Sequence, residues 1–220
     1  MKFTAAVGAL ACLASGAPSV AAEATSIDFA RNGAEAPPAD FAFARTGEGD
    51  LGQWTVVRDT TAAGGFAIEH VSTDRHEDRY PLAIYQPLSL ENGEIAVRFK
   101  IVSGTMLTAG LAFGVRNPDS YYVVSASALE QRVDLLLVVN GNIERIETGA
   151  EVNIETGRWH ALKVIFNDEH VAVALDHKVL FTTYDRTRRK DGRIALWTRE
   201  DNVTRFDQIE IRPLPNTPWQ

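Results

Sequence analysis

Alternation of apolar and polar residues, with almost no helical period, is the feature that most limits how this chain folds. Successive side chains of a β-strand point to opposite faces, so a period of two is typical of half-buried strands. Segments with this pattern lie at residues 94–102, 108–116, 121–127, 133–140, 142–148, 159–167, 170–176, 178–184, 192–198 and 205–211. The sequence therefore predicts an all-β protein.

Short turn sequences separate these segments. Asn-Gly occurs at residues 92–93 and 140–141, Asn-Pro-Asp-Ser at 117–120 and Asp-His at 176–177. Such residues favour β-hairpins because they accept the backbone conformations that tight turns need. Consecutive hairpins in this number predict a two-sheet antiparallel jelly-roll sandwich.

The first 22 residues have the features of a secretory signal peptide. Lys2 precedes an apolar run over residues 3–13, and small residues at 20–22 predict cleavage before Glu23. The apolar run is too short to span a bilayer, so we expect a secreted or periplasmic protein without membrane insertion after cleavage. Residues 9–12 also loosely resemble a bacterial lipoprotein signal, although alanine stands where leucine is usual.

Residues 23–220 are expected to form a single jelly-roll domain. Cys12 is the only cysteine and lies in the signal peptide, so packing without disulfides must stabilise the mature chain. Residues 23–50 carry many prolines, glycines and charges, which are unfavourable in central strands. We expect this segment to wrap the outside of the sandwich.

The mature chain is acidic. The full sequence has 22 Lys and Arg and 29 Asp and Glu, so loss of Lys2 leaves a net charge of 21 − 29 = −8. The densest basic stretch, residues 185–193, also contains two aspartates. No basic block is long enough to follow a phosphate backbone, so we expect neither nucleic acid nor an anionic membrane as a partner.

A charged segment at residues 72–82 brings Asp74, His76, Glu77 and Asp78 close together in the sequence. These side chains could form a metal cluster, but two arginines among them oppose a cation and favour a solvated edge loop. The five histidines have no close metal-ligand spacing, so zinc is not expected.

The hairpin of residues 108–127 suggests where a ligand lies. If residues 117–120 form its loop, the expected pairs are Arg116 with Tyr121, Gly114 with Val123, and Ala112 with Ser125. One side of the hairpin then carries apolar core residues, namely Leu111, Phe113, Val115, Tyr122 and Val124.

The other side of this hairpin carries small residues, with Arg116 and Tyr121 at one end. Such a floor leaves room above the sheet for an extended sugar, which an aromatic ring and an arginine can stack against and hydrogen-bond. Alternatively, a loop or the N-terminal segment lies down on the small residues.

Further residues are expected around this floor. Glu130, Arg132 and Asp134 follow the hairpin and either lie at its rim or form an internal salt bridge. The predicted ligand-binding set is Arg116, Tyr121, Ser125, Glu130, Arg132, Asp134, Trp197 and Arg199. Trp54 and Trp159 each begin an alternating segment, which predicts that they close the core.

Several stretches together resemble a known family: GQWTVVRD, GLAFGVRNPDSYYVVSASALEQRVDL, GRWHALKV and DGRIALWTREDNVTRFDQIEI, within residues 50–212. They are similar to secreted bacterial proteins with the concanavalin A-like lectin/glucanase jelly roll, including laminin G-like modules and, in outline, the 3-keto-disaccharide hydrolases. The resemblance implies the fold more specifically than the function, because this fold hosts lectins, adhesion modules, glucanases and lyases.

Catalytic signatures are missing from the sequence. The family 16 glycoside hydrolases of this fold carry E-x-D-x-E or E-x-D-x-x-E on one strand, and neither spacing occurs here. Retaining glycosidases need two carboxyls about 5 Å apart, which separate strands could still supply. We therefore expect a non-catalytic module that binds a carbohydrate or glycan, with a sugar hydrolase or lyase similar to the 3-keto-disaccharide family as the alternative.

Asp207 occupies a half-buried position in the last predicted strand. Alternation places it opposite Phe206, on the side of Val203, Arg205, Ile209 and Ile211, so we expect it to be partly buried. A buried carboxylate must be paired, hydrogen-bonded or bound to a cation. In the family 16 enzymes that the fold resembles, the aspartate of a late Phe-Asp strand binds a structural calcium ion. The resemblance thus implies calcium at Asp207, and the rival account is a pair with Arg205 or another arginine.

Overall fold

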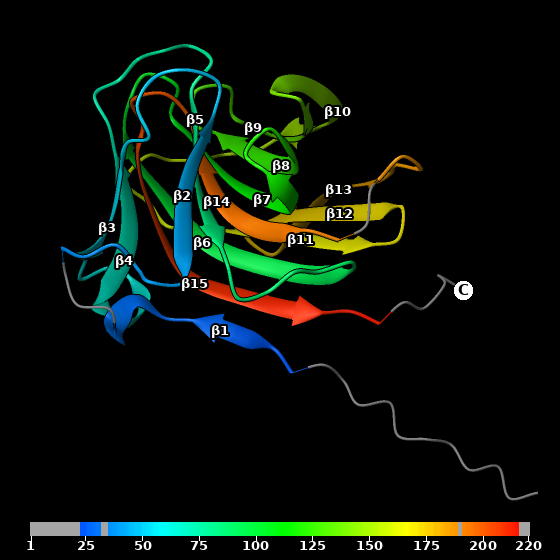
Figure 1. Ribbon diagram of the computed structural model, residues 1–220, viewed down its shortest axis with the longest axis horizontal. Helices are drawn as coiled ribbons and strands as arrows, with labels where there is room; N and C mark the ends of the chain where they lie inside the picture. Colours follow the sequence, from blue (N-terminus) through cyan, green and yellow to red (C-terminus); the bar gives the residue numbers. More distant parts are fainter. Residues whose placement is uncertain (1–22, 32–34, 189–190, 216–220) are drawn as a thin grey trace, which may run out of the picture.

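The computed structural model describes residues 23–31, 35–188 and 191–215, so the predicted signal peptide lies outside the described residues. Two antiparallel sheets pack face to face as a β-sandwich (Figure 1). The all-β, two-sheet jelly-roll prediction is confirmed. No helix among the residues described is long and apolar enough to cross a membrane.

The eight-stranded sheet has the order β13-β12-β11-β6-β15-β4-β3, and β1 pairs with β15 off this path. Its strands are β1 (Thr25–Ile27), β3 (Gln53–Arg58), β4 (Phe66–Val71), β6 (Gly93–Ser103), β11 (His160–Asn167), β12 (His170–Leu175), β13 (Lys178–Tyr184) and β15 (Val203–Pro213). Two short 3-10 helices, η1 (Phe29–Arg31) and η2 (Ala63–Gly65), lie in connections near β1 and β4.

The seven-stranded sheet has the order β10-β9-β8-β7-β14-β5-β2. Its strands are β2 (Phe41–Thr46), β5 (Tyr80–Tyr85), β7 (Thr108–Asn117), β8 (Ser120–Ser127), β9 (Arg132–Val139), β10 (Asn142–Glu151) and β14 (Arg193–Thr198). The N-terminal region supplies β2 at the edge of this sheet and β1 beside β15, where Figure 1 shows β1 in blue next to β15 in red.

The main core fills the space between the two sheets. Along β11 the inward side chains are Leu162, Val164 and Phe166, and every second residue faces out, as the alternation predicts. Trp54 lies in this core with 3% of its surface exposed, which confirms its predicted role.

A second apolar cluster covers the outer face of the seven-stranded sheet. Its members are Tyr80, Leu82, Ile84, Ala112, Val115, Tyr121, Val123, Val138, Ala195 and Trp197. The central strands of this sheet are therefore buried on both faces, which the alternating pattern does not reveal.

The hairpin of β7 and β8 departs from the predicted register. Ala112 pairs with Val123 and Gly110 with Ser125, and a bulge between Phe113 and Asn117 lengthens β7. Gly114 lies within this bulge at a φ of 61°, a conformation that glycine adopts without strain. The predicted pairing was wrong because alternation alone does not show where a strand gains extra residues.

The side assignment of this hairpin holds for most of the residues that were assigned to the core. Leu111, Phe113, Tyr122 and Val124 face the main core as predicted, whereas Val115 belongs to the outer cluster because it follows the bulge.

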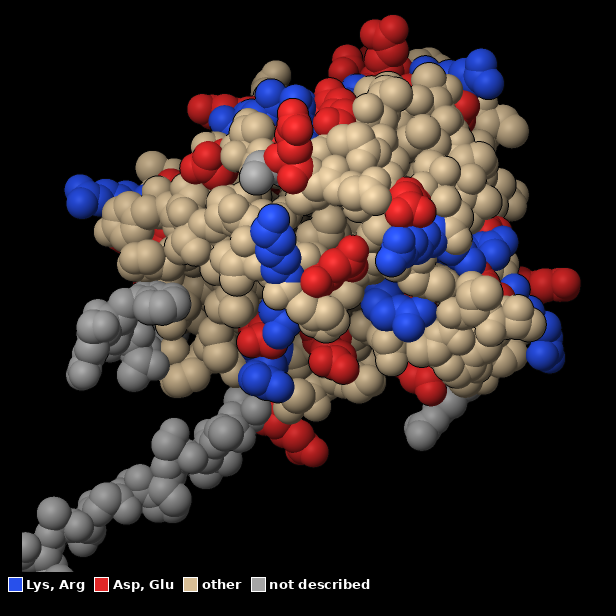
Figure 2. Space-filling model, turned by 180° about the vertical axis from the view of Figure 1, so that it is seen from behind, with Lys and Arg blue, Asp and Glu red and all other residues tan. Residues whose placement is uncertain are grey.

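The face seen from behind carries acidic and basic side chains intermixed, without a broad basic area (Figure 2). A surface of this kind does not concentrate positive charge along a line, as binding to a phosphate backbone requires.

Candidate functional site

A hollow of about 200 Å³ opens on the outer face of the seven-stranded sheet. We call it the first hollow, and its lining residues are Tyr80, Met106, Thr108, Ser125, Ser127, Glu130, Asp134, Leu136, Ile143, Arg145, Trp197 and Arg199. Strand pairing builds its floor, because Trp197 pairs with Gly110, Gly110 with Ser125, and Ser125 with Asp134. Paired residues point to the same face, so these side chains converge on one surface.

Gly110 makes room for the large ring of Trp197 in this floor. A Cβ atom at Gly110 would lie 2.7 Å from the Trp197 ring and 3.0 Å from the carbonyl oxygen of Val124. Any larger residue at this position therefore displaces the indole or the neighbouring strand. The Trp197 ring thus occupies part of the space above the small residues that were predicted to form the floor.

The aromatic residues of the first hollow form a packed layer. The Trp197 and Tyr80 rings stack with centroids 5.5 Å apart and an interplanar angle of 13°, and the Arg199 guanidinium lies 5.5 Å from the Tyr80 centroid. Trp197 is 1% exposed, so it supports the hollow from beneath and offers a ligand little ring surface.

Tyr121 lies under the site instead of at its surface. It is 2% exposed, and its hydroxyl accepts a hydrogen bond from Trp197 Nε1 at 3.2 Å and lies 2.7 Å from Thr46 Oγ1. Burial raises the pKa of Tyr121 to about 12. The prediction that its ring faces solvent is wrong, because the outer apolar cluster encloses the ring.

Asp134 is the central charged group of the first hollow. Its Oδ2 atom lies 2.9 Å from Arg132 Nε and 3.2 Å from Arg145 Nε, and Arg132 also pairs with Glu130 at 2.7 Å. Glu130 and Asp134 thus line the hollow, as one of the two predictions has it, and both form salt bridges with Arg132, as the other has it. Asp134 is 5% exposed, and its Oδ1 atom has no hydrogen-bond partner among the described residues.

A buried acceptor without a partner is costly, so such an atom usually has a water or a ligand hydroxyl as its partner. Arg199 carries a second unsatisfied group at the same hollow, since its Nε atom is buried and has no partner in the part of the chain described here. Two residues that line the first hollow therefore carry a buried acceptor and a buried donor without partners among the described residues.

Most of the predicted ligand-binding residues come together in the structure. Ser125, Glu130, Asp134, Trp197 and Arg199 line the first hollow, while Arg132 holds two of its carboxylates. Arg116 is exposed beyond the bulge and does not line the hollow.

Other lining residues were not predicted from the sequence, among them Tyr80, Ser127 and Arg145. Ser127 could have been found, because it lies two residues from Ser125 and therefore on the same face. Tyr80 and Arg145 reach the hollow only through the order of strands in the sheet, which local patterns do not encode.

Both carboxylates of the first hollow take part in ion pairs. A glycosidase acid is held protonated by apolar surroundings, whereas Glu130 and Asp134 both contact the guanidinium of Arg132. No other carboxylate lines the first hollow among the described residues.

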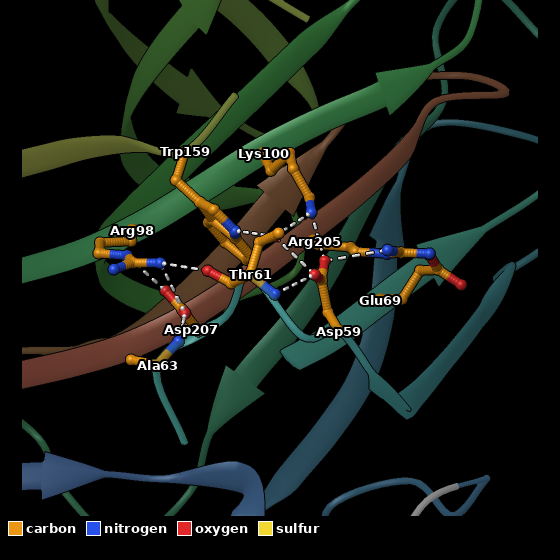
Figure 3. A network of polar contacts seen from close by, with 9 residues as sticks. All are labelled: Asp59, Thr61, Ala63, Glu69, Arg98, Lys100, Trp159, Arg205 and Asp207. Carbon is orange, nitrogen blue, oxygen red and sulfur yellow. Dashed lines mark hydrogen bonds and ion pairs between the residues drawn. The ribbon is translucent and has the colours of Figure 1, made fainter. Parts of the chain in front are cut away.

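Asp207 lies on the outer face of the eight-stranded sheet, within a network of charged residues (Figure 3). It is 1% exposed, and its Oδ1 atom lies 2.9 Å from Arg98 Nε. Its Oδ2 atom accepts hydrogen bonds from the Ala63 amide at 2.7 Å and from Arg98 Nη2 at 3.1 Å. The predicted burial of Asp207 is confirmed. Of the two predicted kinds of partner, Arg205 or another arginine, the structure has the second, Arg98, while Arg205 pairs with Asp59 and Glu69.

These surroundings do not fit a bound calcium ion as they stand. Both carboxylate oxygens of Asp207 face the Arg98 guanidinium or a backbone N–H group, and a cation there meets a positive charge. No group of three or more His, Cys, Asp or Glu side chains suited to a metal occurs among the described residues. Calcium at Asp207 stays a prediction that needs a direct test.

Trp159 belongs to the same charged network and not to the core. Its ring centroid lies 4.9 Å from the Arg98 guanidinium carbon and 4.8 Å from Lys100 Nζ, and its Nε1 atom donates to Thr61 Oγ1 at 2.9 Å. The prediction that Trp159 closes the core is wrong, because Trp159 lies just before β11 and its ring packs against Arg98 and Lys100 instead of the core residues. It covers the salt bridge between Lys100 and Asp59.

No protein-family model and no curated protein matches the sequence, but many solved structures share its fold. A carbohydrate-binding module, CBM66, from Bacillus subtilis superposes with a TM-score of 0.60 at 16% identity, covering 77% of this chain and 94% of that chain. Domain 4 of AbnA, a GH43 extracellular arabinanase from Geobacillus stearothermophilus solved with arabinotriose, gives 0.58 at 16% identity, with coverages of 90% and 96%.

A β-glucanase of Bacillus licheniformis gives a TM-score of 0.57 at 8% identity, covering 87% of this chain and 98% of that chain. At these identities the comparisons show a shared fold. The strand order and these matches together establish that the chain has the concanavalin A-like jelly-roll fold.

Proposed function

We propose that this protein is a non-catalytic carbohydrate-binding module that holds a sugar in the first hollow. The observation that carries this proposal is the buried Oδ1 atom of Asp134, which has no partner among the described residues, in a hollow also lined by Arg199, whose Nε atom is likewise without a partner there. Sugar hydroxyls both donate and accept hydrogen bonds, so one sugar ring can satisfy a carboxylate and a guanidinium together.

The dimensions and lining of the hollow support a small polar ligand. Drug-sized ligands occupy pockets of about 300–1,000 Å³, whereas this hollow measures about 200 Å³. The volume suits one sugar ring, with Ser125, Ser127 and Thr108 as further hydroxyl partners. Leu136 and Ile143 supply apolar surface against the C–H groups of the ring.

The fold comparisons and the predicted export support the same function. Two of the compared proteins are described as a carbohydrate-binding module and as an arabinanase domain in complex with arabinotriose. The latter enzyme is described as extracellular. A secreted or periplasmic location, with the glycan met outside the cytoplasm, follows from the predicted signal peptide.

Hydrolysis or lysis of a sugar is the second candidate, because Glu130 and Asp134 converge on the same hollow. Their shared pairing with Arg132 favours binding. Activity assays on ordinary and 3-keto glycosides, run beside the binding measurements, separate the two functions. Turnover that is lost in Glu130→Gln identifies an enzyme.

A glycan array on the mature protein, residues 23–220, tests the proposed function. A hit is then measured by calorimetry against Asp134→Asn and against Ser125→Leu, which fills the hollow without removing a charge. Both variants are expected to lose at least about tenfold in affinity. For Asp134→Asn the reason is that one hydrogen bond to a charged group contributes roughly 1.5–3 kcal/mol. For Ser125→Leu the reason is that the larger side chain occupies the space of the ligand.

Glu144→Gln is the matched control, because Glu144 lies on β10 beside Arg145 but is exposed and does not line the hollow. Unchanged affinity in Ser125→Leu, with the protein folded, would place the ligand elsewhere. Absence of any glycan hit contradicts the proposed function as a whole.

A further inference from the structure

A fully buried arginine adjoins the first hollow. Arg79 directly precedes Tyr80, which lines the hollow, and Arg79 is 0% exposed. Its Nε atom donates a hydrogen bond to the carbonyl oxygen of Asp50, and its Nη1 atom donates to the carbonyl oxygen of Glu200. The Glu200 amide donates back to the Arg79 carbonyl oxygen at 2.9 Å. Arg79 therefore joins the start of β5 to the turn of residues 199–202 between β14 and β15.

The same turn is joined to a second wall of the hollow. The Asn202 side chain is buried, accepts a hydrogen bond from the Leu107 amide at 3.0 Å and donates to the Thr108 carbonyl oxygen at 3.1 Å. Thr108 lines the first hollow, as does Arg199 at the start of the turn. Three lining segments of the hollow thus meet at residues 199–202.

His70 on β4 makes a further contact with this turn. It is fully buried, and its Nδ1 atom lies 2.9 Å from the carbonyl oxygen of Asn202. A carbonyl oxygen only accepts hydrogen bonds, so Nδ1 carries the proton and neutral His70 leaves its Nε2 atom as an acceptor. We call His70, Arg79 and residues 199–202 the polar hub.

Two buried nitrogen atoms of the polar hub lie against Gly52. A Cβ atom at Gly52 would lie 2.2 Å from His70 Nε2 and 2.6 Å from Arg79 Nη2, so both nitrogens are close to the same point. Neither has a hydrogen-bond partner among the described residues. While His70 is neutral, the positive charge of Arg79 attracts the Nε2 lone pair. A proton on Nε2 instead places a second positive charge beside the guanidinium, in a region shielded from water.

Arg79 is the charged residue that acts on His70. Burial lowers the pKa of His70 to about 4, the Asn202 carbonyl opposes this effect, and the Arg79 charge adds to it. The residues that pair with His70 on the neighbouring strands, Trp54 and Thr204, are uncharged. The other charged residues of the surrounding segments act on Arg79 or pair with one another, namely Arg45, Asp50, Asp74, Arg75, Arg199, Glu200 and Asp201.

We propose, resting on the proposed function, that the polar hub holds the first hollow in its binding shape and that protonation of His70 opens the hub, so that the protein releases its glycan in mild acid. Two buried positive charges separate only if Arg79 or the turn of residues 199–202 moves. Either movement displaces Tyr80 or Arg199 in the hollow. The open hub exposes His70 to water, so acid favours the open state by the uptake of one proton.

Titration of the glycan array with the mature protein at pH 7 and at pH 5 tests this inference, and each glycan that binds serves as its own probe. Asp and Glu carboxyls titrate mainly near pH 4, so most of them stay ionised in this range. We expect the glycans that bind at pH 7 to lose about tenfold in affinity at pH 5, since one proton changes an equilibrium by at most about tenfold per pH unit.

His70→Gln keeps a side chain that can donate to the Asn202 carbonyl but takes up no proton. Its affinities are expected to change by less than about twofold between the two pH values. His76→Gln is the matched control, because His76 is exposed and its hydrogen bond to Asp74 raises its pKa, so it too is protonated at pH 5. This variant is expected to retain the tenfold change.

Hydrogen exchange of the wild-type mature protein tests the movement itself and needs neither a glycan nor a variant. After correction for the intrinsic effect of pH on exchange, the amides of residues 199–202 are expected to exchange at least about tenfold faster at pH 5 than at pH 7. The amides of β11 in the core are expected to keep their rate, which separates an opening of the hub from global unfolding.

Affinities that do not change between pH 7 and pH 5 overturn the inference, as does a change of equal size in His70→Gln. Unchanged exchange at residues 199–202, or equal acceleration in β11, also overturns it. In these cases glycans still bind at pH 7, so the proposed function stands. If no glycan binds at pH 7, the proposed function fails and the inference fails with it.

Discussion

The guanidinium of Arg98 on β6 is the charge partner of Asp207 on β15, with Nε 2.9 Å from Oδ1 and Nη2 3.1 Å from Oδ2. The two residues are direct neighbours across the paired strands. Asp207 also accepts the Ala63 amide at 2.7 Å, so the pair attaches the η2 segment to the sheet (Figure 3). Burial raises the pKa of the Asp207 carboxyl, and the Ala63 amide and Arg98 oppose this rise.

Arg98→Ala is expected to destabilise the protein by about 3 kcal/mol. Removing one partner of a buried ion pair costs about 3–5 kcal/mol, and the 29% exposure of the Arg98 side chain places the effect at the lower end. The measurement is urea denaturation at neutral pH. Arg58→Ala is the control, because Arg58 is exposed and its guanidinium lies 5.0 Å from the Phe66 ring centroid, in a similar cation–π geometry. A loss as large there would contradict the special role of Arg98.

Calcium is expected to leave the melting temperature of the wild type unchanged. The Arg98 guanidinium already neutralises Asp207, so an added cation gains little. Thermal melts of the mature protein in calcium and in excess chelator check this, together with elemental analysis. A clear rise of the melting temperature in calcium, with bound calcium found, supports the metal hypothesis of the family resemblance and contradicts the arginine account.

Stability is expected to fall as the pH drops from about 6.5 to about 4, because of His70. Burial lowers the pKa of His70 from 6.5 to about 4, opposed by the carbonyl of Asn202 and assisted by Arg79. Between these values the unfolded chain binds a proton that the folded protein does not. The stability that depends on a neutral His70 is therefore fully present above pH 6.5. As the pH falls toward 4, the free energy of unfolding decreases by roughly 3 kcal/mol.

The test for His70 compares the pH dependence of unfolding in the wild type and in His70→Gln. The variant is expected to show a flatter profile between pH 4 and 6.5, whatever its absolute stability. His177→Gln serves as the control, since His177 is exposed. An unchanged slope in His70→Gln would show that His70 does not carry this pH dependence.

Tyr121 is expected to act through stability and not through direct contact with the glycan. Tyr121→Ala removes a ring with 2% exposure and should cost about 3–5 kcal/mol. Tyr121→Phe keeps the packing and loses the hydroxyl contacts with Thr46 and Trp197, at about 1–2 kcal/mol. Denaturation and glycan affinity are measured together, and a large loss of affinity in a stable Tyr121→Phe protein would place the hydroxyl in the binding site.

The network around Asp59 is expected to weaken the folded protein in acid. Burial by itself raises the pKa of Asp59, but hydrogen bonds from Lys100 and Thr61 lower it well below its ordinary value. A lowered carboxyl pKa gives stability that is present above the unfolded pKa near 4 and is lost as the pH falls below it. Acid unfolding of Asp59→Asn, monitored by circular dichroism, should therefore start from lower stability at neutral pH and depend less on pH below 4.

Local sequence was sufficient for β6 to β15 and for the sides of most of their residues, whereas β1 to β5 were not predicted, and β5 begins within the stretch expected to be a solvated edge loop. Alternation in β11 places Leu162 and Val164 in the core because successive strand residues face opposite ways, whatever the neighbouring strands are. The same rule placed Asp207 opposite Phe206 and Ser125 on the outer face, as the structure has them. These features depend on period and on turn residues, which are properties of short segments. The rule also placed Ile209 and Ile211 beside Asp207, which was wrong because the irregularity after Asp207 turns both side chains into the core.

The tertiary structure decided how far each face is covered and which distant groups meet. Tyr121 is on the expected side, yet the outer apolar cluster encloses it. Trp159 was predicted to lie in the core, but its ring lies over Lys100 outside the core. The bulge near Gly114 shifts the register, and Arg98 becomes the partner of Asp207 only because β6 pairs with β15. Strand order, bulges and burial of a second face arise from contacts between segments far apart in the chain, and alternation within a single strand is the same whichever of these contacts form.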